Sequence, residues 1–183
     1  MASTQPVVAV PAVEAADDPA VVAELVGLIN NAYSTAERGM WTQDLPRTTP
    51  DEVAVAITGG ELGALRLDGR FVGSVFVRLL DARTGWFGAL AVDPAHGGRG
   101  LGRQLVDFAE QRARAAGADA IQLELLVPAT SHPHTERLAG WYASLGYHHI
   151  EDRDLAEIDP ASVVYAVVPI HASVMRKSLG GVT

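Results

Sequence analysis

The 183-residue sequence predicts a single α/β domain with a mixed sheet. Runs with strand patterns and runs with helical spacing follow one another along the chain, as in mixed α/β folds. An Asp68-Gly69 pair between two apolar runs is a strong signal for an antiparallel hairpin. The length fits one hydrophobic core, because chains of this size rarely divide. We expect the domain to cover residues 7–178, with a flexible tail at 1–6 and a second tail at 179–183.

The first part of the chain predicts one edge strand and two helices. Residues 7–13 are rich in β-forming side chains but contain Pro11, which suits an edge strand. An Asp-Asp-Pro cap opens a helix over about 17–33, with apolar residues on one face. Residues 30–47 have no clear period and predict a loop. A Thr-Pro start and a Gly-Gly end predict a short helix over 49–60.

Strands and helices alternate in the remainder of the chain. Residues 62–67 and 71–80 flank the hairpin turn. Residues 85–92 are apolar on both faces, so we expect this strand at the centre of the sheet. A glycine-rich turn then leads to an amphipathic helix over 101–117. The other expected elements are a strand at 121–127, a helix at 136–145, and strands at 147–151 and 173–177.

The composition excludes several classes of protein. The absence of cysteine excludes disulfides, thiolate metal sites and a cysteine nucleophile. The formal net charge of −8 argues against a surface that binds nucleic acid. Charged residues interrupt every apolar run before it reaches the length of a membrane span, and the N-terminus lacks the pattern of a signal peptide. We therefore expect a cytoplasmic protein with no membrane contact and no nucleic-acid partner.

A glycine-rich segment, residues 97–103, joins the predicted central strand to a helix. Glycines let a backbone approach a ligand closely, and the start of a helix attracts anions, so the segment suits a diphosphate. A P-loop is excluded, because Gly102-Arg103-Gln104 stands where Gly-Lys-Ser/Thr is required. A dinucleotide fingerprint fits poorly, because Arg103 takes the place of its last glycine. A glycine-rich turn that binds nothing is the remaining alternative.

Two motifs resemble the GNAT superfamily of N-acetyltransferases. Leu90-Ala91-Val92-Asp93-Pro94, followed by Gly100 and Gly102, is similar to the family's acyl-CoA-binding signature. Gly97 departs from that signature, which has arginine or glutamine there. The second motif, Trp141-Tyr142-Ala143-Ser144-Leu145-Gly146-Tyr147, resembles the family's aromatic-Tyr-x-x-Leu-Gly-Phe/Tyr segment. The order of the expected elements also resembles the GNAT fold, in which helices flank a central mixed, mostly antiparallel sheet.

The resemblance implies acetyl-CoA as cosubstrate, bound where the strand at 85–92 separates from the strand at 121–127. It assigns the pantetheine arm and the diphosphate to one set of residues: Leu90, Ala91, Val92, Gly97, Gly98, Arg99, Gly100, Leu101, Gly102 and Arg103. A backbone amide near Leu90 or Ala91 would polarise the thioester carbonyl. Tyr142 matches the residue that protonates the departing thiolate. A core tyrosine on an amphipathic helix is the alternative for Tyr142.

The group that deprotonates the amine is less well marked. Glu124 lies among leucines near the expected separation of the strands, where desolvation would increase the proton affinity of its carboxylate. A solvated or ion-paired carboxylate is the alternative. His132 and His134 lie in a connection that we expect beside the acceptor site, and no third ligand accompanies them, so we expect no metal. Thr135 stands where the family often has asparagine.

These features predict direct transfer of an acetyl group from acetyl-CoA to the primary amine of a small molecule. An aromatic and acidic acceptor site built from Tyr33, Glu37, Trp41 and Asp44 would suit a cationic amine. Acetylation of a protein or peptide is one alternative, and a non-catalytic acyl-CoA sensor on the same fold is another. The apolar run at 163–170 suits either a homodimer contact or a buried connection before the last strand.

Overall fold

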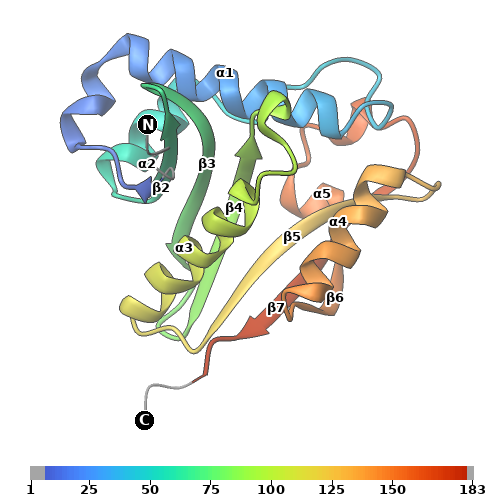
Figure 1. Ribbon diagram of the computed structural model, residues 1–183. Coiled ribbons are helices and arrows are strands. Elements are labelled where there is room, and N and C mark those ends of the chain that lie inside the picture. The colour runs from blue at the N-terminus through green and yellow to red at the C-terminus, as the bar shows by residue number, and fades with distance from the viewer. Residues whose placement is uncertain (1–6, 181–183) are drawn as a thin grey trace.

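The computed structural model describes residues 7–180, which form a seven-stranded sheet with helices on both faces (Figure 1). The strand order is β1-β2-β3-β4-β5-β7-β6. Only β4 and β5 pair in parallel, and the other neighbours are antiparallel. The strands are β1 (Val8–Ala9), β2 (Leu62–Leu67), β3 (Arg70–Leu79), β4 (Thr84–Val92), β5 (Ala120–Pro128), β6 (His148–Asp154) and β7 (Ile170–Ser178). The expected mixed, mostly antiparallel sheet is therefore confirmed.

The helices cover the sheet in two groups. They are α1 (Pro19–Ala36), α2 (Pro50–Thr58), α3 (Leu101–Ala115), α4 (Pro133–Ser144) and the short α5 (Leu155–Ile158). The first two helices pack on one face in a cluster that includes Leu25, Val53 and Leu62. Helices α3 and α4 pack on the other face in a cluster that includes Leu105 and Tyr142. None of the helices in the described range is long and apolar enough to cross a membrane.

Local signals explain the elements that match the sequence best. Asp18 caps α1, and Thr49 and Glu52 form a reciprocal capping box at α2. Asp68 and Gly69 both have positive φ, 50° and 81°, as the tight turn between β2 and β3 requires. The strand expected at the centre is β4, the middle member of the sheet order.

Several expectations about the ends of the chain need correction. The first strand covers only Val8–Ala9, because the chain turns at Pro11 into a 3₁₀ helix. Helix α1 continues to Ala36, into the segment expected to be loop. The tail expected at 1–6 lies outside the described residues, as do residues 181–183 of the tail expected at 179–183. Leu179, which we assigned to the C-terminal tail, is instead buried in the core.

The connection before β7 was expected to be either buried or a dimer contact. Val163, Val164 and Val167 are exposed, and only Ile170 at its end is buried. The segment pairs with the loop after α1, where Val167 N donates to Met40 O and Thr42 N donates to Tyr165 O. A buried connection is therefore wrong for most of this run, and a contact between two copies of the chain stays a prediction.

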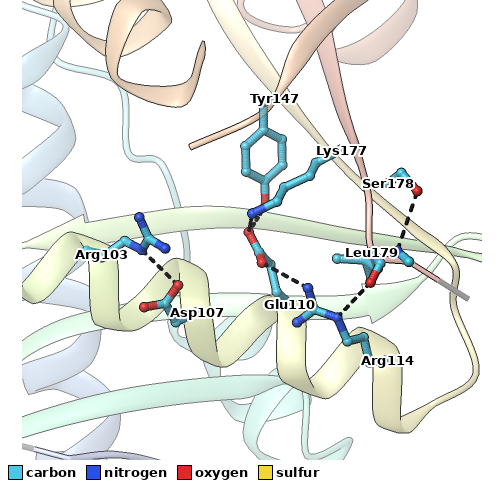
Figure 2. A network of polar contacts seen from close by, with 9 residues as sticks. Arg103, Asp107, Glu110, Arg114, Tyr147, Lys177, Ser178 and Leu179 are labelled. Carbon is cyan, nitrogen blue, oxygen red and sulfur yellow. Dashed lines mark hydrogen bonds and ion pairs between the residues drawn. The ribbon is translucent and has the colours of Figure 1, made fainter. Parts of the chain in front are cut away.

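A buried ion pair fixes α3 against the last strand (Figure 2). Glu110 of α3 has a side chain only 6% exposed, and it accepts hydrogen bonds from Lys177 Nζ at 2.7 Å and Tyr147 Oη at 3.1 Å. Lys177 is the one lysine of the sequence. Arg114 Nη2 adds a longer contact to the same carboxylate at 3.4 Å. Burial, followed by the neighbouring Glu110 charge, raises the pKa of Tyr147, so its hydroxyl remains a donor at neutral pH.

Removing one partner of this pair should destabilise the fold strongly. We expect Lys177→Met to lower the free energy of unfolding by about 3–5 kcal/mol, because it leaves the buried Glu110 carboxylate with only the longer contact to Arg114. Arg103→Met is the matched control, since it breaks an exposed pair with Asp107 and should cost less than about 1 kcal/mol. Urea unfolding at pH 7 measures both. Equal losses in the two variants would show that the Glu110–Lys177 pair does not fix α3.

Candidate functional site

A cavity of about 420 Å³ lies beside strands β4 and β5 and is lined by helices from both faces of the sheet. The end of α1, the end of β4, the start of α3, the middle of β5 and one face of α4 all line it. It contains most of the residues that the sequence marks as site residues: Leu90, Ala91, Val92, Gly97, Gly98, Gly100, Leu101, Gly102, Arg103, Glu124 and Tyr142. Arg99 is exposed and lies outside the lining.

The cavity exists because β4 and β5 separate. They pair in parallel at only three positions, and the last of these joins Trp86 to Gln122. Beyond it, β4 continues along β3 and β5 continues along β7, so the two strands diverge (Figure 1). The facing backbone edges at 90–92 and 123–126 both reach the cavity. An extended ligand can therefore hydrogen-bond there as an additional strand would.

A β-bulge shapes β4 at the point where the strands separate. Ser74 pairs with Ala91 whereas Phe76 pairs with Gly88, so β4 has one more residue than β3 in this interval. Ala89 in the bulge has φ of +46°, a left-handed conformation that costs a non-glycine residue about 1 kcal/mol or more. Leu90 in the bulge has no partner in the β3 ladder, Ala91 and Val92 pair with β3 again, and all three residues line the cavity.

The glycine-rich loop ends at the N-terminus of α3 and supplies free backbone donors. Gly98 and Gly100 have φ of +73° and +76°, which glycine adopts without strain. No side chain among the described residues caps α3, so the N–H groups of Leu101, Gly102 and Arg103 have no partner within the helix. Together with the positive end of the helix dipole, they form an anion-binding site.

One expected contact of this loop needs correction. The N–H of Gly97 does not point to a ligand, because it donates to the carbonyl of Pro94 at 3.3 Å. The side chain of Arg103 lines the cavity, and its Nε donates to Asp107 at 2.8 Å. The remaining N–H groups of that guanidinium are cationic donors that a ligand in the cavity can use.

Tyr142 lies in an aromatic cluster on α4 and faces the cavity. Its ring contacts those of Phe87, Trp141 and Tyr147, with centroids 4.9–6.1 Å away. Tyr142 is 6% exposed, and burial raises the pKa of its hydroxyl well above the ordinary value of 10.0. No side chain or carbonyl in the described range bonds that hydroxyl, so it is a protonated donor that a ligand can use. Tyr142 is therefore a core residue that also lines the cavity, and its role as a proton donor stays a prediction.

Glu124 also lines the cavity but is not the isolated, desolvated carboxyl that we expected. Its side chain is 24% exposed, and Oε1 accepts a hydrogen bond from Arg153 Nη1 at 3.1 Å. Arg153 lies on β6, 29 residues away in the sequence. Glu124 is therefore a carboxylate paired with Arg153, and its role as general base stays a prediction.

The histidine-containing segment borders the cavity at two residues, His134 and Thr135. His134 lines it, and burial, with smaller contributions from Arg137 and His132, lowers the pKa of its imidazole. His132 caps α4 instead, and its Nδ1 lies 2.9 Å from the hydroxyl of Thr135. That hydroxyl is therefore engaged within the protein. Residues 7–180 contain no cluster of three or more acidic or histidine side chains arranged to hold a metal.

On the side of the cavity where we expected the acceptor to bind, the lining residues differ from the expected ones. Tyr33 and Glu37 line it, but Trp41 and Asp44 do not. Arg47, which sequence analysis did not select, lies in the lining beside them. It belongs to a segment without periodicity, and only the three-dimensional structure brings it next to α1.

Comparisons with known proteins agree on one family. The acetyltransferase (GNAT) family model matches residues 28–147. A mycothiol acetyltransferase from Beutenbergia cavernae is 45% identical over 56 residues, which are 31% of this chain and 19% of that relative. The match thus spans about a fifth of the length of the relative, and the whole relative's activity does not follow from it.

Solved structures share the fold at low sequence identity. The PaiA N-acetyltransferase from Thermoplasma acidophilum in complex with coenzyme A has a TM-score of 0.70 at 12% identity, over 96% of this chain and 99% of that one. An aminoglycoside 6′-N-acetyltransferase complexed with coenzyme A has 0.67 at 15%, over 91% and 95%. The ribosomal-protein-S18-alanine N-acetyltransferase from Escherichia coli has 0.66 at 14%, over 98% and 97%.

The burial of Tyr142 gives a measurable consequence. Because burial raises the pKa of the Tyr142 hydroxyl, we expect this hydroxyl to remain protonated above pH 10.0 in the folded protein. The free energy of unfolding that depends on the neutral phenol should therefore decline only above that pH. Phenolate absorbance should therefore rise equally in the wild type and in Tyr142→Phe until each unfolds. A titrating group near pH 10 that is lost in the variant would contradict the buried, protonated hydroxyl.

Proposed function

The chain belongs to the acetyltransferase (GNAT) family, and we propose that it transfers the acetyl group of acetyl-CoA directly to a primary amine of a small molecule. The observation that carries the proposal is a single cavity that joins an unpaired strand edge, a helix N-terminus with free donors and a buried tyrosine hydroxyl. Acetyl-CoA supplies an activated thioester. The residues of this chain bind it, orient it and handle the protons.

Two parts of the cavity fit the two polar parts of acetyl-CoA. The exposed backbone edge of β4 at Leu90 and Val92 would bind the amides of the pantetheine arm. The free N–H groups at 101–103, assisted by Arg103, would bind the diphosphate. Gly98 and Gly100 allow the loop to take the required shape. A backbone amide near Leu90 or Ala91 would then donate to the thioester oxygen as negative charge develops on it.

Tyr142 is the proposed general acid. Its hydroxyl is held protonated by burial and faces the cavity, so it would deliver a proton to the departing sulfur. The absence of cysteine removes the thiolate that an acyl-enzyme of that type would need, which supports direct attack by the amine. This arrangement favours an enzyme over a non-catalytic sensor.

Glu124 is the proposed general base. It lines the same cavity, and its Oε1 is paired with Arg153 Nη1, whereas its Oε2 has no hydrogen-bond partner among the described residues. We expect Glu124 to remove a proton from an ammonium group as the amine is bound, before the attack.

A small acceptor suits the dimensions of the cavity. The volume of about 420 Å³ includes the parts assigned to the pantetheine arm and the diphosphate as well as to the acceptor, so the space that remains for the acceptor is that of a small molecule. The similar proteins differ in the size of their acceptors, since their names include mycothiol and aminoglycoside acetyltransferases but also a ribosomal-protein-alanine acetyltransferase. A cytoplasmic location also stays a prediction.

Replacing the proposed acid separates catalysis from cofactor binding. We expect Tyr142→Phe to lower kcat about 10²–10⁴-fold, because the departing thiolate loses its proton donor. The Kd for acetyl-CoA, measured by calorimetry, should stay within about threefold, because the aromatic packing is retained. Turnover is measured as thiol release with the amine that gives the fastest rate in a panel.

Tyr165→Phe is the matched control, because this variant loses the same hydroxyl at a residue outside the cavity lining. It should leave both kcat and the Kd for acetyl-CoA unchanged. Full activity of Tyr142→Phe would remove Tyr142 from the mechanism, and failure of the wild type to bind acetyl-CoA would remove the proposed function altogether.

A further inference from the structure

Arg47 has a backbone that is held firmly in place. Asn30 of α1 accepts hydrogen bonds at Oδ1 from the backbone N–H groups of Arg47 at 2.8 Å and Thr48 at 3.0 Å. The amide of Asn30 also donates to the carbonyl of Thr48 at 3.1 Å, and Thr48 is itself buried. This double clamp fixes the origin of the Arg47 side chain, which distinguishes it from an ordinary surface arginine.

The guanidinium of Arg47 is positioned within the cavity. Its carbon lies 4.6 Å from the centroid of the Tyr33 ring, in a cation–π contact. The side chain is 30% exposed, and it lines the cavity next to Glu37. Stacking on an aromatic ring holds the flat guanidinium in one plane, which reduces the entropy lost when it binds a partner.

No protein carboxylate binds this guanidinium closely. The nearest one in the described range, Glu37 Oε1, lies 4.0 Å from Nη1, at the limit for an ion pair. The other oxygen of Glu37 already accepts a hydrogen bond from Trp41 Nε1 at 2.8 Å. Asp159 attracts Arg47 from further away, but it accepts hydrogen bonds from Ser162. Arg47 therefore keeps N–H groups that can donate to a ligand.

The other arginine of the lining is placed differently. Arg103 lies at the start of α3, on the cofactor side of the cavity, and is paired with Asp107. Arg47 thus provides the positive charge on the α1 side. A purely cationic acceptor would have to approach this charge, while the carboxylate that we expected to attract it, Glu37, already accepts a hydrogen bond from Trp41.

We propose that Arg47 binds a carboxylate of the acceptor, so that the acceptor is an amino acid or a similar molecule with both an amine and a carboxylate. This inference rests on the proposed function, because it concerns the acceptor of the same cavity. The amine would face Glu124 at the separation of β4 and β5, and the carboxylate would accept paired hydrogen bonds from the planar guanidinium. The inference replaces the expectation of a cationic amine, which an acidic lining had suggested.

The test compares acceptors that differ only in the carboxylate. Initial rates of thiol release from acetyl-CoA are measured for each of several amino acids against its primary amide, and for 4-aminobutyrate against 1,4-diaminobutane. For the best carboxylate acceptor, kcat/KM should exceed that of its uncharged or cationic counterpart at least about tenfold. In Arg47→Gln the higher kcat/KM of the carboxylate acceptor should disappear. Its kcat/KM should fall about 10–100-fold, whereas the kcat/KM of the counterpart without a carboxylate should change less than about threefold.

Two further variants make the result specific. Arg38→Gln removes the same charge from an exposed residue outside the lining, and it should change none of these ratios. Arg47→Lys keeps the charge but loses the planar pair of donors, so it should restore part of the preference for the carboxylate. Calorimetry with acetyl-CoA should give the wild-type Kd for all three variants, which shows that each one is folded and binds the cofactor.

The possible failures differ from one another. If amines without a carboxylate are acetylated equally well, or if Arg47→Gln lowers both members of a pair equally, Arg47 does not recognise a carboxylate and the inference is wrong. If no amine in the panel is acetylated, or if acetyl-CoA does not bind, the proposed function itself is wrong and the inference fails with it.

Discussion

Strands β4 and β5 hydrogen-bond to each other only at their first positions, and each part of the candidate site depends on their separation beyond Trp86 and Gln122. Parallel neighbours normally continue their ladder, because unpaired backbone groups in the interior are costly. Here the neighbours on the outer sides, β3 and β7, keep their own ladders, so each strand loses partners on one edge only. The result is a backbone edge inside the molecule that is available to a ligand.

Surrounding contacts keep this separation open. On one side the bulge at Ala89 turns β4 away, at the cost of a left-handed conformation for an alanine. On the other side the aromatic rings of Phe87, Tyr142 and Tyr147 pack together behind the opening. The buried Glu110–Lys177 pair then ties α3 to β7, across the strand that separates. Because α3 carries the free N–H groups, this pair also fixes the anion-binding end of the site relative to the strand edge.

The sequence predicted those features that depend on neighbouring residues. Caps, turns and glycines identify helix starts, the hairpin and the loop before α3, because their geometry requires particular residue types within a few positions. Features that depend on distant residues were missed or wrong. Glu124 meets Arg153, Glu110 meets Lys177, and Arg47 meets Tyr33 only after the sheet is assembled. The α1 side of the cavity is built mostly from such long-range contacts, which is why Arg47 was not selected there, whereas the glycine-rich loop was located from its motif.

Hydrogen exchange with and without acetyl-CoA tests whether the ligand binds along the open edge of β4 and at the start of α3. Amides are compared by mass spectrometry of peptides covering 88–92, 101–104 and 123–127. We predict slower exchange in these segments when acetyl-CoA is present, and little change in α2 or β6, which lie away from the cavity. Binding that protects other segments and leaves these three unchanged would contradict this prediction.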